Sequence, residues 1–268
     1  MKNIVMLWVI ICIFLSASGV TAGEGKITCL FPPDWASKPA KAKIITDALA
    51  EKSGLPILPR IVESYAQILE ACNSDARVLV YAGSFVQAVM HSRGIGVPLV
   101  QIINGKEYYS GIMIYPRGEE PQAILEKYPE LISYAKGASS GESSAKAATG
   151  GEASIGVSDH AAAIRAVEHK AARAAFVKNW WWESNGQKFP ELAAYRVPGI
   201  SVEENPDNIL TASNKIPPEI AKKIAQAATE SGQAFDAQKV VPFDVSRLAF
   251  SLELMKKGNI DPLYYNWE

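Results

Sequence analysis

Small hydroxyl residues and a glycine stand directly before a helix-compatible run near the middle of the chain. Ser139, Ser140 and Gly141 follow Ala138 and precede residues 142–148. At the start of a helix, hydroxyl groups and free backbone N–H groups can donate to an anion, and the helix dipole favours negative charge there. Serines also cap helices that bind nothing. The segment therefore predicts either an oxyanion site or an ordinary helix cap.

A histidine lies at the start of the next expected helix. Ser158, a good helix cap, and Asp159 precede His160, which falls in the first turn. Beside the positive end of the helix dipole an imidazole resists protonation, so it would offer a neutral N–H donor to an anion. A surface histidine without a ligand is the alternative interpretation.

Four tyrosines lie where expected strands end or expected helices begin, namely Tyr65, Tyr81, Tyr108 and Tyr109. In open α/β sheets, ligands bind outside the carboxyl ends of the strands. These tyrosines could therefore line a binding cleft. Ordinary packing explains each one, taken singly, equally well.

Three adjacent tryptophans, residues 180–182, follow an apolar run. Because three neighbouring indoles cannot all face one side, we expect at least one of them to be exposed or to contact a ligand or a partner. Packing between two lobes would explain them as well.

One segment matches a motif of serine enzymes. Ser143 and Lys146 have the S-x-x-K spacing of penicillin-interacting enzymes, and residues 158–160 loosely match their S-D-N motif, but no K-T-G follows. A serine-rich segment produces S-x-x-K by chance. We therefore expect a protein that is not an enzyme, and an acyl-transferase using Ser143 and Lys146 is the remote alternative. No cysteine and histidine spacing indicates a metal site, and we expect no cofactor.

The elements that must position these residues alternate between strand and helix. We expect strands over residues 27–31, 60–63, 77–81 and 99–103, and helices over 39–52, 66–72 and 85–91. This alternation predicts a mostly parallel sheet with helices on both faces.

A second alternating set follows the first. We expect strands over residues 112–115 and 174–177, helices over 122–128 and 159–172, a link over 207–213, and two final helices over 217–232 and 243–258. The fold class is therefore α/β with two lobes and two crossings of the chain. We assign residues 23–112 and 210–268 to lobe 1, and residues 113–209 to lobe 2.

The N-terminus has the features of a secretory signal peptide. Lys2 precedes an apolar run over residues 4–15, and small residues end at Ala22. The apolar run is shorter than the roughly 20 residues that a membrane-spanning helix needs. We therefore expect residues 1–22 to be cleaved and a soluble protein to be exported to the periplasm. An uncleaved membrane anchor is the alternative.

Charge and cysteine content restrict the partners. The chain has 27 Lys and Arg against 28 Asp and Glu, a net charge of −1. Near neutrality argues against nucleic acid, which requires a basic face. Beyond the predicted signal peptide only Cys29 and Cys72 remain, and an exported protein with one pair favours a disulfide. Two free core cysteines would fit their apolar neighbours as well.

Taken in order, these motifs resemble the phosphate, phosphite and phosphonate substrate-binding proteins of ABC transporters, within the type II periplasmic binding protein fold. The resemblance runs from about residue 27 to residue 229. It rests on residues 64–66, 79–84, 104–110, 139–141, 160–167 and 206–210.

The resemblance assigns roles to several residues. It implies that tyrosines matching Tyr65 and Tyr108 hydrogen-bond the ligand from the first lobe. It also implies that the Ser139-Ser140-Gly141 turn and His160 hold the phosphorus oxygens from the second lobe, while an acid matching Asp207 lies near the other end of the ligand. We add Tyr81 and Trp180 to this set of candidate binding residues because of their places after strands.

The chain departs from the family pattern at three positions. Ala138 replaces a hydroxyl residue, Arg173 replaces an aspartate, and Trp180 stands where binders of aminophosphonates carry a glutamate for the ligand's ammonium group. A buried ammonium without a partner is unfavourable. The departure at Trp180 therefore argues against an amine on the ligand.

The sequence as a whole predicts a monomeric periplasmic binding protein that closes its lobes on a small oxyanion. The expected ligand is phosphate, phosphite or a phosphonate without an amine, and the expected partner is the membrane permease of an ABC importer. A sensory module of the same fold, serving a histidine kinase or an envelope complex, is the alternative.

Overall fold

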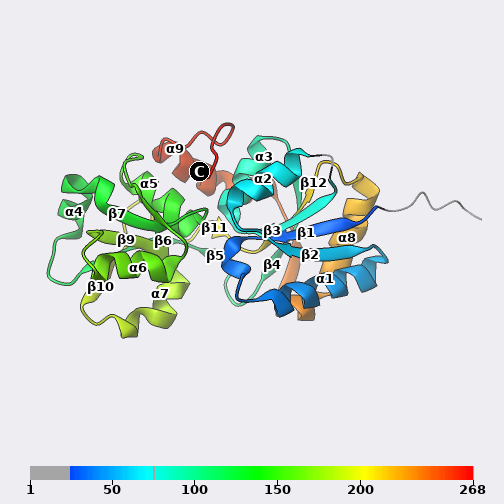
Figure 1. Ribbon diagram of the computed structural model, residues 1–268, viewed down its shortest axis with the longest axis horizontal. Helices are drawn as coiled ribbons and strands as arrows, with labels where there is room; N and C mark the ends of the chain where they lie inside the picture. The colour runs from blue at the N-terminus through cyan, green and yellow to red at the C-terminus, as the bar shows by residue number, and fades with distance from the viewer. Residues whose placement is uncertain (1–24, 75, 268) are drawn as a thin grey trace, which may run out of the picture.

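Two lobes, each built around a β-sheet, lie side by side in the protein (Figure 1). The computed structural model describes residues 25–74 and 76–267, and the predicted signal peptide lies outside these residues. The α/β fold class and the two-lobed architecture are confirmed. Within the described residues, no helix has the length and apolar character needed to cross a membrane.

The first lobe contains a sheet with the strand order β13-β4-β12-β3-β1-β2. Its strands are β1 (Ile27–Phe31), β2 (Ile57–Ile61), β3 (Val78–Ala82), β4 (Gly96–Ile103), β12 (Ile209–Ser213) and β13 (Lys239–Pro242). Its helices are α1 (Pro39–Ser53), α2 (Tyr65–Asn73), α3 (Ser84–Ser92) and α8 (Pro218–Glu230).

The second lobe contains a sheet with the strand order β10-β6-β9-β7-β8. Its strands are β6 (Gly111–Pro116), β7 (Ile132–Ala135), β8 (Ile155–Val157), β9 (Ala174–Lys178) and β10 (Leu192–Tyr195). Its helices are α4 (Pro121–Lys127), α5 (Ser144–Ala148), α6 (His160–Glu168) and α7 (Asn179–Asn185). The short antiparallel strands β5 (Tyr108–Tyr109) and β11 (Asn205–Pro206) pair where the chain crosses between the two sheets.

Most strands of each sheet run in one direction, as expected, and both sheets also contain reversed strands: β12 and β13 in the first and β6 in the second. In the first sheet, β12 runs antiparallel to both β3 and β4, whereas β1, β2 and β3 are parallel. In the second sheet, β6 runs antiparallel to β9 and β10. The reason is that β6 and β12 each enter their sheet from the crossing, at the edge where the other strands end. The expected link over residues 207–213 is therefore in part a fully buried strand in the middle of the sheet.

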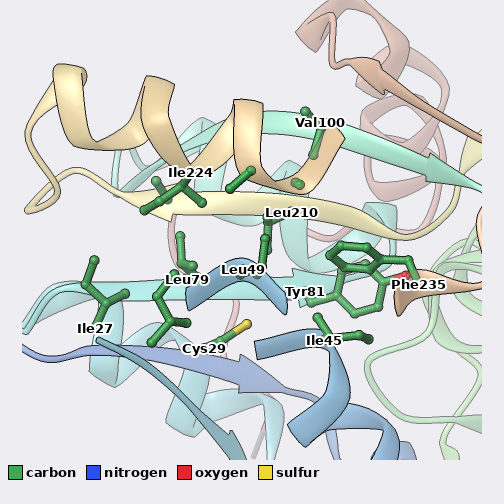
Figure 2. Packing of buried hydrophobic residues seen from close by; sticks show 14 of the residues in the cluster. Ile27, Cys29, Ile45, Leu49, Leu79, Tyr81, Val100, Leu210, Ile224 and Phe235 are labelled. Carbon is green, nitrogen blue, oxygen red and sulfur yellow. The ribbon is translucent and has the colours of Figure 1, made fainter. Parts of the chain in front are cut away.

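The first sheet is covered on both faces. Alternate residues of a strand point to opposite sides, so Ile27, Cys29 and Phe31 pack against α1 and α8, whereas Leu30 packs against α2 and α3. Figure 2 shows the first of these cores, in which Ile45 of α1 and other apolar side chains meet the strands. Burial on both faces holds the sheet rigid beneath the loops that follow its strands.

The two cysteines are free, so the expected disulfide is wrong. Cys29 lies on the face of the sheet that packs against α1, and Cys72 lies on α2 in the cluster on the opposite face. The sheet therefore separates the two sulfur atoms. Burial raises the pKa of the Cys72 thiol to about 12 and also raises that of Cys29.

We predict that a chain lacking residues 1–22 has no thiol accessible to a thiol-specific chromogenic reagent while it is folded. Cys29 and Cys72 have 0% and 1% of their surface exposed, and a protonated thiol reacts slowly. After unfolding in guanidinium chloride without a reductant, both thiols should react. A chain that shows no thiol after unfolding would carry the disulfide after all.

The last helix, α9 (Ala249–Lys257), packs on both lobes rather than on lobe 1 alone. Its Phe250 and Leu254 belong to a core cluster of the second lobe, whereas Met255 belongs to a cluster of the first. In Figure 1 this helix lies between the two lobes on one side of the molecule. We expected residues 210–268 to belong to lobe 1, whereas the helix that begins at residue 249 contacts both lobes.

Candidate functional site

A cavity of about 360 Å³ lies between the lobes, and residues from both lobes and from the crossing line it. It forms where the carboxyl ends of strands from the two sheets face each other. The lining residues follow those ends: Asp34 comes after β1, Tyr65 after β2, Ser139 after β7 and His160 after β8. This is the position in which open α/β sheets bind ligands.

The structure brings together most of the residues that the sequence singles out for binding. The candidates that line the cavity are Tyr65, Tyr81, Ser139, Ser140, His160 and Asp207. The candidates that do not line it are Tyr108, Gly141 and Trp180.

Tyr109 lines the cavity in place of Tyr108. Both belong to β5, where neighbouring side chains point to opposite sides. Tyr109 has 3% of its surface exposed, and Tyr108 instead lies beside the Arg247 guanidinium, 5.9 Å from the ring centroid. Gly141 serves packing, because a Cβ there would lie 2.7 Å from the carbonyl oxygen of Ala135.

Trp181 lines the cavity, whereas Trp180 does not. The ring of Trp180 packs against that of Tyr109, with 6.0 Å between the two ring centroids. The cavity also holds the carboxyl groups of Asp34 and Asp207. We expected a ligand without an amine because Trp180 was assumed to contact the ligand. Since Trp180 does not line the cavity, this expectation lacks a structural basis. Arg173, another departure from the family pattern, pairs with Glu119 away from the cavity.

The serine turn begins after β7 as a π-helical turn over Ser139–Ser143 and continues into α5. The main chain of Ser139 is held by the Ser144 hydroxyl, which donates to its carbonyl oxygen at 2.8 Å. Ser139 and Ser140 are each 2% exposed and face the cavity. The turn thus presents two hydroxyl groups and the start of a helix to the cavity between the lobes.

Ser143, the nucleophile in the acyl-transferase alternative, is fully buried and does not line the cavity. The Lys146 ammonium lies over the ring of Tyr265, 5.4 Å from its centroid. The S-x-x-K spacing therefore belongs to the packing of the turn against the C-terminal segment.

His160 reaches the cavity from the first turn of α6. Asp159 rather than Ser158 caps this helix, because its carboxylate accepts the N–H of Ala162 at 2.8 Å. Burial, and next the nearby Lys178 ammonium, lower the pKa of His160 to about 4. The imidazole is therefore neutral at neutral pH, and its buried Nδ1 has no hydrogen-bond partner among the described residues.

An ion pair crosses the cavity between the second lobe and the crossing segment. Lys178, at the end of β9, lies with its Nζ 2.5 Å from Oδ2 of Asp207, which stands just before β12. The ammonium also lies 4.3 Å from the centroid of the Tyr109 ring. The side chains are only 21% and 15% exposed, so the pair places an ammonium and a neutralising carboxylate, both shielded from water, at the cavity.

A hydroxyl network joins the lobes at the cavity. Ser84 at the start of α3 lies with its Oγ 2.9 Å from the Oγ of Ser139 and 3.1 Å from the hydroxyl of Tyr109. These three groups come from the first lobe, the second lobe and the crossing. The two lobes are therefore in direct polar contact in this conformation.

The sequence analysis missed several lining residues, namely Asp34, Trp35, Lys38, Lys178 and Asn208, and among the three adjacent tryptophans it chose Trp180 instead of Trp181. Lys178 could have been found from its position directly after an apolar strand. Asp34 and Trp35 could have been found in the same way, since they follow the buried β1 and two prolines. Partial loss of hydration raises the pKa of Asp34, an effect that the nearby Lys38 opposes. Among the described residues, no group of three or more His, Cys, Asp or Glu side chains is arranged to hold a metal ion.

Comparison with known proteins identifies the fold but finds no sequence relative. No protein-family model and no curated sequence matches the chain. XAC2383 from Xanthomonas citri bound to chloride ion superposes with a TM-score of 0.70 at 12% identity, over 87% of this chain and 97% of that one.

Two further solved structures belong to phosphonate proteins by their descriptions. PhnD1 from Prochlorococcus marinus in complex with methylphosphonate has a TM-score of 0.65 at 14% identity, over 87% of this chain and 98% of that one. The binding protein component of an ABC phosphonate transporter from Pseudomonas aeruginosa has a TM-score of 0.66 at 13% identity, over 87% of each chain. The chain therefore has the two-lobed fold of the type II periplasmic binding proteins.

Proposed function

We propose that this protein is a periplasmic solute-binding protein that encloses a small phosphorus oxyanion and delivers it to the membrane permease of an ABC importer. One observation carries the proposal. Ser139, Ser140, His160 and Lys178, which come from three separate segments of the second lobe, converge on one cavity at the carboxyl ends of the strands. The fold that the chain shares with a methylphosphonate-bound protein supports it.

Each of these groups suits an anion in a different way. The hydroxyl of Ser140 can donate to an oxygen of the anion, and the hydroxyl of Ser139 can do so while it accepts from Ser84. The neutral imidazole of His160 can donate one N–H, and the Lys178 ammonium, which pairs with Asp207, has further N–H groups to donate. Hydrogen bonds to charged groups are stronger than those between neutral groups, so a phosphate, phosphite or phosphonate would gain more here than an uncharged solute.

Binding would occur by closure of the two lobes. The ligand would lie between residues of both lobes, as in other hinge-closing binding proteins. Tyr65, Tyr81 and Tyr109 would complete the site from the first lobe and the crossing. The predicted signal peptide supports export, and we propose that the protein acts as a monomer. The burial of Ser143 outside the cavity favours binding over acyl transfer.

We expect phosphate, phosphite or methylphosphonate to stabilise protein that has been unfolded and refolded to remove any bound ligand. At a thousandfold excess over Kd, a specific ligand adds about 4 kcal/mol to the free energy of unfolding, which raises Tm by about 10 °C for a chain of this size. Thermal unfolding with each anion measures the effect, with sulfate and L-arginine as controls. Stabilisation by arginine and by none of the phosphorus anions would contradict the proposal.

A further inference from the structure

The turn that carries Ser139 and Ser140 is closed by a buried carboxylate. Glu142 lies in the same turn with 3% of its surface exposed, and its Oε2 accepts the N–H of Gly137 at 2.7 Å. This contact spans residues 137–142, so the loop that it closes contains both serines. The Glu142 side chain therefore holds the backbone from which the two hydroxyls reach the cavity.

A tyrosine near the C-terminus holds the other oxygen of this carboxylate. The hydroxyl of Tyr265 donates to Oε1 of Glu142. Burial, and next the neighbouring Glu142, raise the pKa of Tyr265, so its hydroxyl keeps its proton and stays a donor. Each oxygen of the carboxylate thus accepts from one donor, and a buried carboxylate is stable only when it is hydrogen-bonded in this way.

Tyr265 is itself anchored in the first lobe. Its carbonyl oxygen accepts from the Arg93 guanidinium at 2.5 Å, at the end of α3, and Arg93 also donates to the carbonyl oxygen of Pro262 at 2.8 Å. The ring of Tyr265 lies 5.7 Å from that of Phe85 in α3, measured between centroids. In Figure 1 the chain ends beside α9, between the two lobes. The hydrogen bond to Glu142 therefore joins the core of one lobe to the serine turn of the other.

Resting on the proposed oxyanion function, we infer that Tyr265 is a positioning residue for the bound anion and acts through Glu142. Neither side chain lines the cavity, so both affect the anion only by way of the turn. Glu142 holds the turn so that the hydroxyls of Ser139 and Ser140 point into the cavity, and Tyr265 holds Glu142. A hydroxyl that is turned away from the line to its acceptor loses most of the hydrogen bond. A turn that is fixed before the anion arrives avoids the cost of ordering it during binding.

Calorimetric titration of three variants with phosphate and methylphosphonate tests this inference. Glu142→Leu removes the contacts to both Gly137 and Tyr265, and we expect it to bind each anion about tenfold more weakly, the lower end of what loss of one hydrogen bond to a charged group causes. Tyr265→Phe removes only one contact and should weaken binding about threefold. In Glu142→Gln the amide oxygen can accept the N–H of Gly137 while the amide nitrogen donates to Tyr265, so this variant should recover most of the affinity that Glu142→Leu loses.

A matched control separates positioning from stability. Thr149 is 8% exposed and also accepts a backbone N–H with its side chain, that of Ala153 at 2.9 Å, but it lies at the far end of α5 and outside the cavity. Thr149→Val should therefore lower the thermal stability and keep the wild-type affinity for both anions. Tyr265→Phe should cause little further loss of affinity in the Glu142→Leu background, because the two residues act in series.

The outcomes distinguish the inference from the proposed function. If the wild-type protein binds the anions and both Glu142→Leu and Tyr265→Phe bind them as Thr149→Val does, the two residues are only structural and the inference is overturned. Full, independent losses in the double variant would overturn it as well. Circular dichroism checks the folding, and Tyr265→Phe, which lacks a single hydroxyl, decides the question if Glu142→Leu does not fold. Failure of the wild-type protein to bind either anion would instead overturn the proposed function.

Discussion

A Lys178→Met variant is expected to bind phosphate about a hundredfold more weakly than the wild-type protein. A hydrogen bond to a charged group is worth roughly 1.5–3 kcal/mol, and its loss alone lowers affinity about tenfold to a hundredfold. The substitution also leaves Asp207, whose side chain is only 15% exposed, without its partner at 2.5 Å. A carboxylate without a counter-ion would then repel the entering anion.

Two further variants separate these effects. In Lys178→Met/Asp207→Asn the unpaired carboxylate is removed as well, so the double variant should recover about tenfold of the lost affinity. Lys106→Met is the matched control, because the Lys106 ammonium also lies near Trp180, 5.8 Å from the ring centroid, but pairs with Glu183 and does not line the cavity. Calorimetry with phosphate measures all three variants. A Lys178→Met protein that binds like Lys106→Met would show that the cavity does not hold the anion through this lysine.

The alternation of apolar strands and helices was enough to predict the two lobes, because local periodicity reports which segments are strands and which are helices. It did not predict that β12 lies in the middle of the first sheet. This strand is a short run, Ile209–Ser213, that becomes a strand through pairing with β3 and β4, more than a hundred residues away. Pairing between distant segments leaves no periodicity in the sequence.

The sequence predicted which segments form the candidate site more reliably than it predicted which residues of those segments line it. Ser139 and His160 follow strand ends, and both line the cavity. The sequence could not show which of two neighbouring aromatic residues faces the cavity. The register of β5 with β11 turns Tyr109 toward it, and the orientation of α7 does the same for Trp181.

The sequence also showed no sign of the ion pair between Lys178 and Asp207. Lys178 and Asp207 are 29 residues apart and meet only because β9 and the crossing end at the same place. Each is unremarkable alone, since lysine and aspartate at the ends of strands usually face water. Their pairing within a cavity follows from the fold and is visible only in three dimensions.

The second large effect is expected at Gly137, where the two lobes touch. Gly137 has a φ of +74°, and a Cβ at this position would collide with the ring of Tyr65 from the first lobe. That ring cannot easily withdraw, because it packs on its other side near Trp267, with 5.5 Å between the ring centroids. A methyl group at Gly137 should therefore hold the lobes apart.

We predict that Gly137→Ala lowers the affinity for phosphate at least thirtyfold. Closing the lobes would then require free energy to relieve the collision with Tyr65, and this free energy would make binding weaker. Gly150→Ala is the matched control: its φ of +62° imposes similar backbone strain, of about 1–2 kcal/mol, but a Cβ there has no neighbour within 4 Å. Both variants should lose similar thermal stability without ligand, and only Gly137→Ala should lose affinity. Small-angle X-ray scattering should show that phosphate reduces the radius of gyration of Gly150→Ala and not that of Gly137→Ala. If Gly137→Ala contracts and binds as Gly150→Ala does, Tyr65 and Gly137 do not meet in the closed, ligand-bound form.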